Sequence, residues 1–193
     1  MSLLRKSDLI SIGAKDEIRK YAKASKILVA EAKDFNERQS YDIFISHSYR
    51  DFGPESELNK MFLGLKRLLE NESYNVFIDW IDTPELDRSR VTSKTAAKLK
   101  NIIENCSCLF YVPSMSSGES KWMPWEMGLM DGLTGKVAIC PVVEQAESFY
   151  SGSEYLGIYP YFFKDDGDFM VSLDKYGSET ITFYRWLRNG GIF

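Results

Sequence analysis

Four short segments of the chain are apolar without regular polar alternation, and each is rich in β-branched or aromatic residues. They span residues 41–46, 75–79, 109–112 and 137–143. Unbroken apolar runs of this length are typical of strands buried on both faces of a parallel sheet. The runs begin about 30 residues apart, which is the length of one β-α-β unit.

Between these runs, apolar residues recur every three or four positions, as they do along one face of a helix. One such set is Leu58, Met61, Phe62, Leu65, Leu68 and Leu69, and another is Ala96, Leu99, Ile103 and Cys106. Alternating strands and helices predict an α/β fold, a doubly wound and mostly parallel sheet with helices on both faces.

The two flanks of this pattern differ from its centre. Residues 14–37 predict one long amphipathic helix, which packs either on the domain's own surface or on a partner. We therefore divide the chain into an N-terminal helical extension (1–39) and an α/β domain (40–193), whose residues 144–193 form a C-terminal elaboration. Within that elaboration we predict strands at 158–163 and 169–173 around a turn at 165–167, and a helix at 178–188 that ends at Gly190 and Gly191.

Composition is that of an ordinary globular domain. The chain has 193 residues, 44% hydrophobic and 27% charged, with a net charge of −4. This mildly acidic balance gives no general attraction to nucleic acid or to an anionic membrane. No apolar run is long enough to span a bilayer, and the first residues lack the apolar core of a signal peptide, so we expect a cytoplasmic protein.

The sequence contains few residues that could bind a metal ion and no recognisable cofactor-binding motif. The three cysteines, Cys106, Cys108 and Cys140, have no CxxC spacing, and His47 is the only histidine. We expect reduced, buried cysteines that serve packing, and no metal site. Neither GxGxxG nor GxxxxGK[ST] occurs, which disfavours a Rossmann or P-loop cofactor, so we expect no cofactor.

Polar residues follow three of the predicted strands. Ser46 ends the first and His47 follows it, Asp79 ends the second and Trp80 follows it, and Ser114 comes after the third. In an open parallel sheet, ligands bind at the carboxyl ends of the strands, where strand order reverses. These side chains are therefore candidate lining for a hydroxyl-rich ligand such as a ribose.

One carboxylate stands out after the third strand. Ser120 is a plausible N-cap and Pro124 is tolerated in a first helical turn, so Glu126 should lie near a helix N-terminus, where the dipole favours the ionised form. Trp122 and Trp125 flank it. The spacing alone also fits a second interpretation, in which Glu126 only stabilises the helix start and the tryptophans fill the core.

Three motifs resemble the TIR (Toll/interleukin-1 receptor) domain family. Residues 41–46 carry its first signature, an aromatic residue followed by Asp, an apolar residue, Phe, Ile and Ser, and residues 76–79 resemble its second strand. Trp122 and Glu126 resemble the W-x-x-x-E of TIR domains that cleave NAD⁺. The motifs occur in the family's order over residues 41–143, and the resemblance implies the flavodoxin-like TIR fold, a catalytic Glu126 and a Ser46 close to the ligand.

The whole pattern looks like the stand-alone bacterial TIR proteins of Thoeris antiphage defence. That resemblance implies an enzyme that converts NAD⁺ to nicotinamide and a cyclic ADP-ribose isomer, which then activates a separate effector. It also implies assembly with other TIR domains. NAD⁺ is then a substrate and not a cofactor.

The implied chemistry suggests further roles. The Glu126 carboxylate can stabilise an oxocarbenium-like ribose, and Trp122 and Trp125 can shape a water-poor pocket around it. Trp80 can stack on nicotinamide or adenine. Arg88 and Arg90 either hold the pyrophosphate or are solvated loop charges. Because the chemistry needs no base, His47 is better interpreted as a polar loop residue than as a catalyst.

Two other functions fit parts of the pattern. A non-enzymatic TIR adaptor would share the fold and the first motif, but it would not need Trp122 and Glu126 at the catalytic spacing. A nucleoside deoxyribosyltransferase-like enzyme would share the fold and a glutamate at a ribosyl centre, but it would lack the signature of residues 41–46.

Overall fold

A computed structural model describes residues 2–33, 40–48, 50, 56–78, 93–144, 154–174 and 176–189. Within these ranges the centre of the molecule is a seven-stranded sheet of order β3-β2-β4-β5-β7-β8-β9. The strands are β2 (Tyr41–Ser46), β3 (Val76–Ile78), β4 (Cys106–Tyr111), β5 (Val137–Ile139), β7 (Tyr161–Asp165), β8 (Asp168–Ser172) and β9 (Thr180–Thr182). The first five pair in parallel, and β8 and β9 are antiparallel. The predicted mostly parallel α/β sheet is confirmed.

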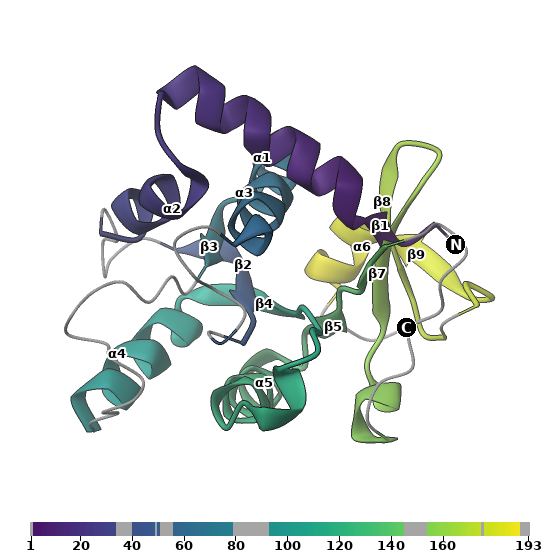
Figure 1. Cartoon of the computed structure of the whole chain (residues 1–193). Helices are drawn as coiled ribbons and strands as arrows, with labels where there is room; N and C mark the ends of the chain where they lie inside the picture. Colours follow the sequence, from purple (N-terminus) through teal and green to yellow (C-terminus); the bar gives the residue numbers. More distant parts are fainter. Residues whose placement is uncertain are drawn as a thin grey trace.

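Helices cover both faces of the sheet, as a doubly wound fold requires (Figure 1). Helices α3 (Glu57–Glu70) and α6 (Phe183–Arg188) lie on one face, and α4 (Ser93–Glu104) and α5 (Trp122–Thr134) lie on the other. Side chains of β2 alternate between two cores: Ile43 and Ile45 pack with the α3 side, and Phe44 packs with the α5 side.

The strand boundaries differ from the predicted ones where pairing overrides the local pattern. Cys106 was predicted on a helix, but it begins β4 because it pairs with Tyr41 at the start of β2. Thr180–Thr182 were predicted as helix, but they form β9 by pairing with β8. The three cysteines are free and buried, as predicted.

The predicted C-terminal hairpin is present. β7 and β8 are joined by Asp166 and Gly167, both at positive φ (45° and 95°), which gives the two-residue turn that matches strand twist. β7 begins at Tyr161 and not at residue 158, because Glu154–Ile158 form the short 3-10 helix η5. Since β7 pairs with β5, the C-terminal elaboration completes the central sheet. Gly190 and Gly191 lie outside the described residues.

The single helix predicted for residues 14–37 is wrong, because the chain forms two helices, α1 (Lys6–Lys20) and α2 (Ala24–Lys33). Tyr21 adopts a left-handed conformation (φ 50°), and the N–H groups of Tyr21 and Ala22 close the end of α1 on the carbonyls of Ile18 and Glu17 at 3.3 and 3.2 Å. The Glu17 carboxylate then accepts the N–H of Ala24 at 2.6 Å, at the start of α2.

Helix α1 packs along α3 and forms an outer layer on that face (Figure 1). Gly13 and Gly64 allow the close approach, because a Cβ added to Gly13 would overlap the carbonyl oxygen of Lys60, and one added to Gly64 would overlap that of Leu9. The short strand β1 (Leu4–Arg5) also pairs in parallel with β6 (Val142–Val143). The N-terminal helices thus pack on the domain itself.

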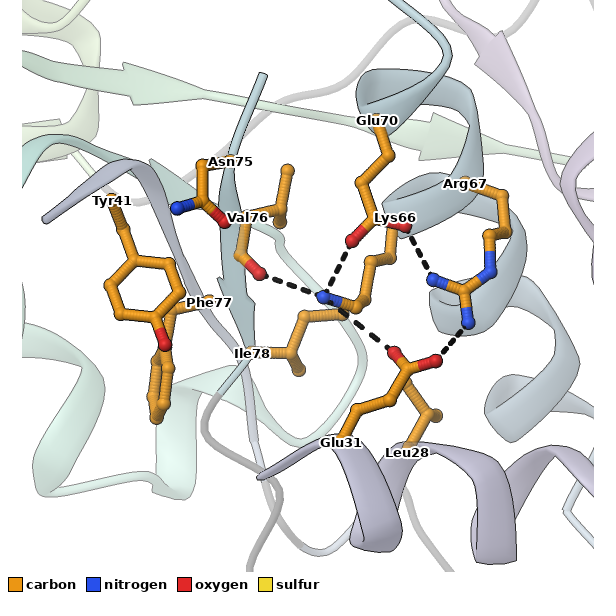
Figure 2. Close-up of a pocket in the computed structure, with 10 residues that line it drawn as sticks. All are labelled: Leu28, Glu31, Tyr41, Lys66, Arg67, Glu70, Asn75, Val76, Phe77 and Ile78. Carbon is orange, nitrogen blue, oxygen red and sulfur yellow. Dashed lines mark hydrogen bonds and ion pairs between the residues drawn. The ribbon is translucent and has the colours of Figure 1, made fainter. Parts of the chain in front are cut away.

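An ion-pair network joins α1, α2 and α3. Arg67 on α3 bonds to Asp16 at 2.7 Å and also pairs with Glu31 and Glu70. Figure 2 shows the adjacent Lys66, whose Nζ lies 2.8 Å from Glu70 Oε1 and 2.8 Å from the carbonyl oxygen of Val76 in the edge strand β3.

Candidate active site

The strand order reverses between β2 and β4, because the chain leaves β2 for β3 on one side and then crosses to β4 on the other. Ser46 is the last residue of β2 and is in register with Tyr111, the last residue of β4. The Val112 N–H donates to the Ser46 carbonyl at 3.0 Å. This switch point is where open α/β sheets bind ligands.

Glu126 comes to the same place from α5, which packs against β4, β2 and β5. Its side chain has no solvent exposure, and neither does that of Ser46. The Ser46 hydroxyl donates a hydrogen bond to Glu126 Oε2 at 2.6 Å, a length typical of a hydroxyl bound to a carboxylate. The structure therefore joins two residues that are 80 positions apart in the chain.

The helical position of Glu126 differs from the predicted one. The Ser120 hydroxyl accepts the N–H of Met123 at 3.2 Å, as expected of an N-cap, and Pro124 lies in the first turn. Because α5 begins at Trp122, Glu126 falls in the second turn, and the first turn contains no acidic residue. The helix dipole acts mainly on the terminal turn and is weaker at this position, whereas the Ser46 hydroxyl bonds directly to the Glu126 carboxylate.

Trp122 and Trp125 lie outside the core. Their rings meet edge to face, with centroids 5.3 Å apart and planes at 88°. Trp125 is 38% exposed and Trp122 is half-buried, whereas Met123, Met127 and Met130 provide the buried face of α5. The interpretation in which these tryptophans fill the core is therefore wrong.

His47 is buried on the other side of the sheet. It is only 2% exposed, and its ring packs on Phe62 of α3 at 4.8 Å between centroids. Ser46 by contrast faces α5. The expected polar loop residue is thus enclosed near α3, and the adjacent residues Ser46 and His47 serve opposite faces.

Ser114 follows β4 and is half-buried. Its N–H donates to the Ser117 hydroxyl at 2.8 Å, and the two hydroxyls lie 3.1 Å apart. Ser117 belongs to the polar run that the sequence places after the third strand, whereas Tyr111 was expected only as a strand residue; both are buried. Burial raises the pKa of Tyr111, which also hydrogen-bonds with Ser117. The serine-rich run at 114–117, directly after a predicted strand, was the available signal.

Four predicted residues, Asp79, Trp80, Arg88 and Arg90, lie outside the described residues. The cavity drawn in Figure 2, about 250 Å³, lies beside the edge strand β3 between α2 and α3, and none of the predicted site residues lines it. In the described part of the chain, no group of three or more His, Cys, Asp or Glu side chains is arranged to hold a metal ion. Nor does any described helix combine the length and apolar character needed to cross a membrane.

Comparison with family models gives no match. Two curated bacterial proteins are similar. "Probable 3' cyclic ADP-D-ribose synthase ThsB'" of Bacillus cereus (strain MSX-D12) is 39% identical over 167 residues, which cover 83% of this chain and 83% of that protein. "Putative cyclic ADP-D-ribose synthase TIR2" of Cytobacillus dafuensis is 32% identical over 111 residues, or 57% of this chain and 27% of that protein.

The first similarity extends well beyond the motifs at residues 41–143, because it covers most of both chains. The structure agrees with this similarity in two ways. Its parallel strands have the order expected of the flavodoxin-like TIR fold, and a glutamate lies where the strand order reverses. The chain belongs to the Thoeris-type TIR proteins of the cyclic ADP-D-ribose synthase family.

Proposed function

We propose that this chain cleaves the N-glycosidic bond of NAD⁺, releases nicotinamide and closes the remaining ADP-ribose into a cyclic signal for antiphage defence. The observation that carries the proposal is the buried Glu126 carboxylate at the strand-order reversal, in a chain that is 39% identical to a protein named as a cyclic ADP-D-ribose synthase.

The carboxylate suits the difficult part of this reaction. Nicotinamide leaves as a neutral molecule from a cationic ring, so no general acid is needed. Positive charge develops on the ribose as the bond to C1′ breaks. A fixed anion beside the sugar stabilises that charge and accepts hydrogen bonds from the ribose hydroxyls.

Closure of the ring needs a nucleophile from the same molecule. A hydroxyl oxygen or an adenine nitrogen of ADP-ribose attacks C1′, and an attacking hydroxyl passes its proton to the Glu126 carboxylate as the new bond forms. Water would compete and give open ADP-ribose, so the site must exclude it. The paired indoles of Trp122 and Trp125 are apolar surface suited to that exclusion.

We further propose that activity requires assembly. Glu126 is wholly enclosed in the isolated chain, so ribose reaches it only after covering groups move. Contact with another TIR domain is the event that we expect to open the site. The cyclic product then acts on a separate effector, and we place the reaction in the cytoplasm, where NAD⁺ is held.

The test compares NAD⁺ consumption by the wild-type chain and by Glu126→Gln, with nicotinamide and nucleotide products separated by chromatography and identified by mass. We expect the variant to lose at least about 100-fold in rate, as for other groups that stabilise charge in a transition state, while keeping its circular dichroism spectrum. Glu104→Gln, an exposed carboxylate on α4 that pairs with Lys100, is the matched control and should retain full activity.

Wild-type rates in Glu126→Gln would overturn the role of this carboxylate. A product that is only open ADP-ribose would overturn cyclisation but leave cleavage standing.

A further inference from the structure

We propose that Ser46 is a positioning residue that acts through Glu126, and that its hydroxyl keeps the Glu126 carboxylate ionised and fixed in one orientation toward the ribose. The inference deepens the proposed function and rests on it. The expectation that Ser46 lies close to the ligand stays a prediction beside it.

Ser46 and Glu126 form a short hydrogen bond between two groups that are shielded from solvent. The donor and the acceptor are both fully buried, and 2.6 Å separates the Ser46 oxygen from Glu126 Oε2. A serine hydroxyl has one proton to donate, and here it points to the carboxylate. The Ser46 backbone is also fixed, because its carbonyl accepts from Val112 at 3.0 Å and its strand pairs with β4.

The chemistry explains why such a donor is needed. Burial by itself favours a neutral carboxyl group, whereas the proposed reaction uses an anion. A hydrogen bond donated to the anion opposes that effect. The helix start contributes little, since Glu126 lies in the second turn of α5. The hydrogen bond from Ser46 therefore favours the ionised form of this enclosed carboxylate, which is the form that the proposed reaction uses.

Several of the described titratable groups on the elements packed around Glu126 have contacts of their own. His47 packs on Phe62 on the opposite face, and Tyr111 has its pKa raised by burial. On α5 itself, Asp131 accepts from the Tyr159 hydroxyl at 3.1 Å. Lys100 and Glu104 of α4 form an exposed pair, and β5 has no titratable side chain between Val137 and Ile139.

The experiment measures the protonation of Glu126 directly. Infrared spectra of the full chain are recorded across a pH series, and the carboxyl stretch that is missing in Glu126→Gln is assigned to Glu126. This band reports a carboxyl group, so titration of His47 does not contribute to it. In Ser46→Ala we expect the protonated band to appear about one to two pH units higher than in the wild type, the effect of losing one hydrogen bond to a charged group.

Turnover of NAD⁺ is followed over the same pH series. In Ser46→Ala we expect kcat to fall at least tenfold near neutral pH, the acid limb to move upward by the same interval, and KM to change less than kcat. Ser46→Thr keeps the hydroxyl, so the infrared titration of Glu126 and the acid limb of kcat should both stay near their wild-type pH values. Ser172→Ala removes another fully buried serine hydroxyl from the same sheet, in β8, and should change neither.

An unchanged Glu126 titration in Ser46→Ala would overturn the inference. So would a rate loss that is equal at every pH and is not restored by Ser46→Thr. Should Ser46→Ala fail to fold, Ser46→Cys, nearly isosteric with a weaker donor, must show the same upward shift. The infrared result does not depend on turnover, so failure of the proposed function, seen as wild-type NAD⁺ consumption by Glu126→Gln, is separable from failure of this inference.

Discussion

At the scale of single residues, burial changes what a side chain can do. Glu126 is enclosed with a hydrogen-bond donor, whereas the three cysteines are enclosed among apolar side chains. Burial raises the pKa of the Cys106 thiol to about 12, and it raises the pKa of Cys108 and Cys140 above the ordinary thiol value. The reactive thiolate is therefore almost absent near neutral pH.

We predict that none of the three thiols of the native chain reacts with Ellman's reagent at pH 8 within minutes, and that all three react in guanidinium chloride. The absorbance of the released thiolate measures this. Rapid labelling of one thiol in the folded protein would contradict the described packing.

At the scale of elements, the same substitution should have opposite effects in two helices. At Gly64 of α3 an added methyl group meets the backbone of α1, and we expect Gly64→Ala to lower the free energy of unfolding by about 2 kcal/mol or more. At Gly132 of α5 a Cβ meets nothing within 4 Å, so Gly132→Ala should raise the stability by about 0.5 to 1 kcal/mol through helix propensity.

Urea unfolding followed by circular dichroism gives both values. Equal effects at the two sites would mean that α1 does not lie against α3 as described.

Individual elements also show where the local apolar pattern is enough to predict secondary structure. Residues 41–46 form the predicted strand and residues 57–70 the predicted helix, because the spacing of their apolar side chains matches burial on two faces of a sheet or on one stripe of a helix. Residues 14–37 do not, since nothing in that apolar stripe marks Tyr21 for a left-handed conformation. Thr180–Thr182 become a strand only because β8 offers an edge to pair with.

At the scale of the whole molecule, Arg67 joins the N-terminal layer to the domain. Its side chain is 13% exposed and pairs with Asp16, Glu31 and Glu70, which come from three helices. We expect Arg67→Met to lower the free energy of unfolding by about 2 to 3 kcal/mol, less than for a fully buried pair because part of the network is hydrated. Arg5→Met, which removes an exposed pair with Asp8, should cost less than about 0.5 kcal/mol.

The network also predicts a pH dependence. Burial raises the pKa of Asp16 and Glu31, but hydrogen bonds and charge from Arg67 and its neighbours outweigh burial, so both pKa values are lowered from the ordinary 3.8 and 4.5. The folded state then binds fewer protons than the unfolded chain. Their stabilisation is present above about pH 5 and is lost as the pH falls through the lowered values.

We expect the urea midpoint of the wild type to fall below pH 4.5 more steeply than that of Arg67→Met. Parallel slopes in the two proteins would show that Arg67 does not set these pKa values.

The sequence by itself determined the fold class, the polar residues at the ends of the parallel strands, the family motifs and Glu126 as the candidate carboxylate. These depend on periodicity and on short local patterns, which the chain carries in linear form. Only the tertiary structure decided that Ser46 holds Glu126, that His47 faces α3, and that two N-terminal helices pack on the domain. Each of these depends on residues far apart in the chain, and therefore on strand register, helix crossing and burial that no local window contains.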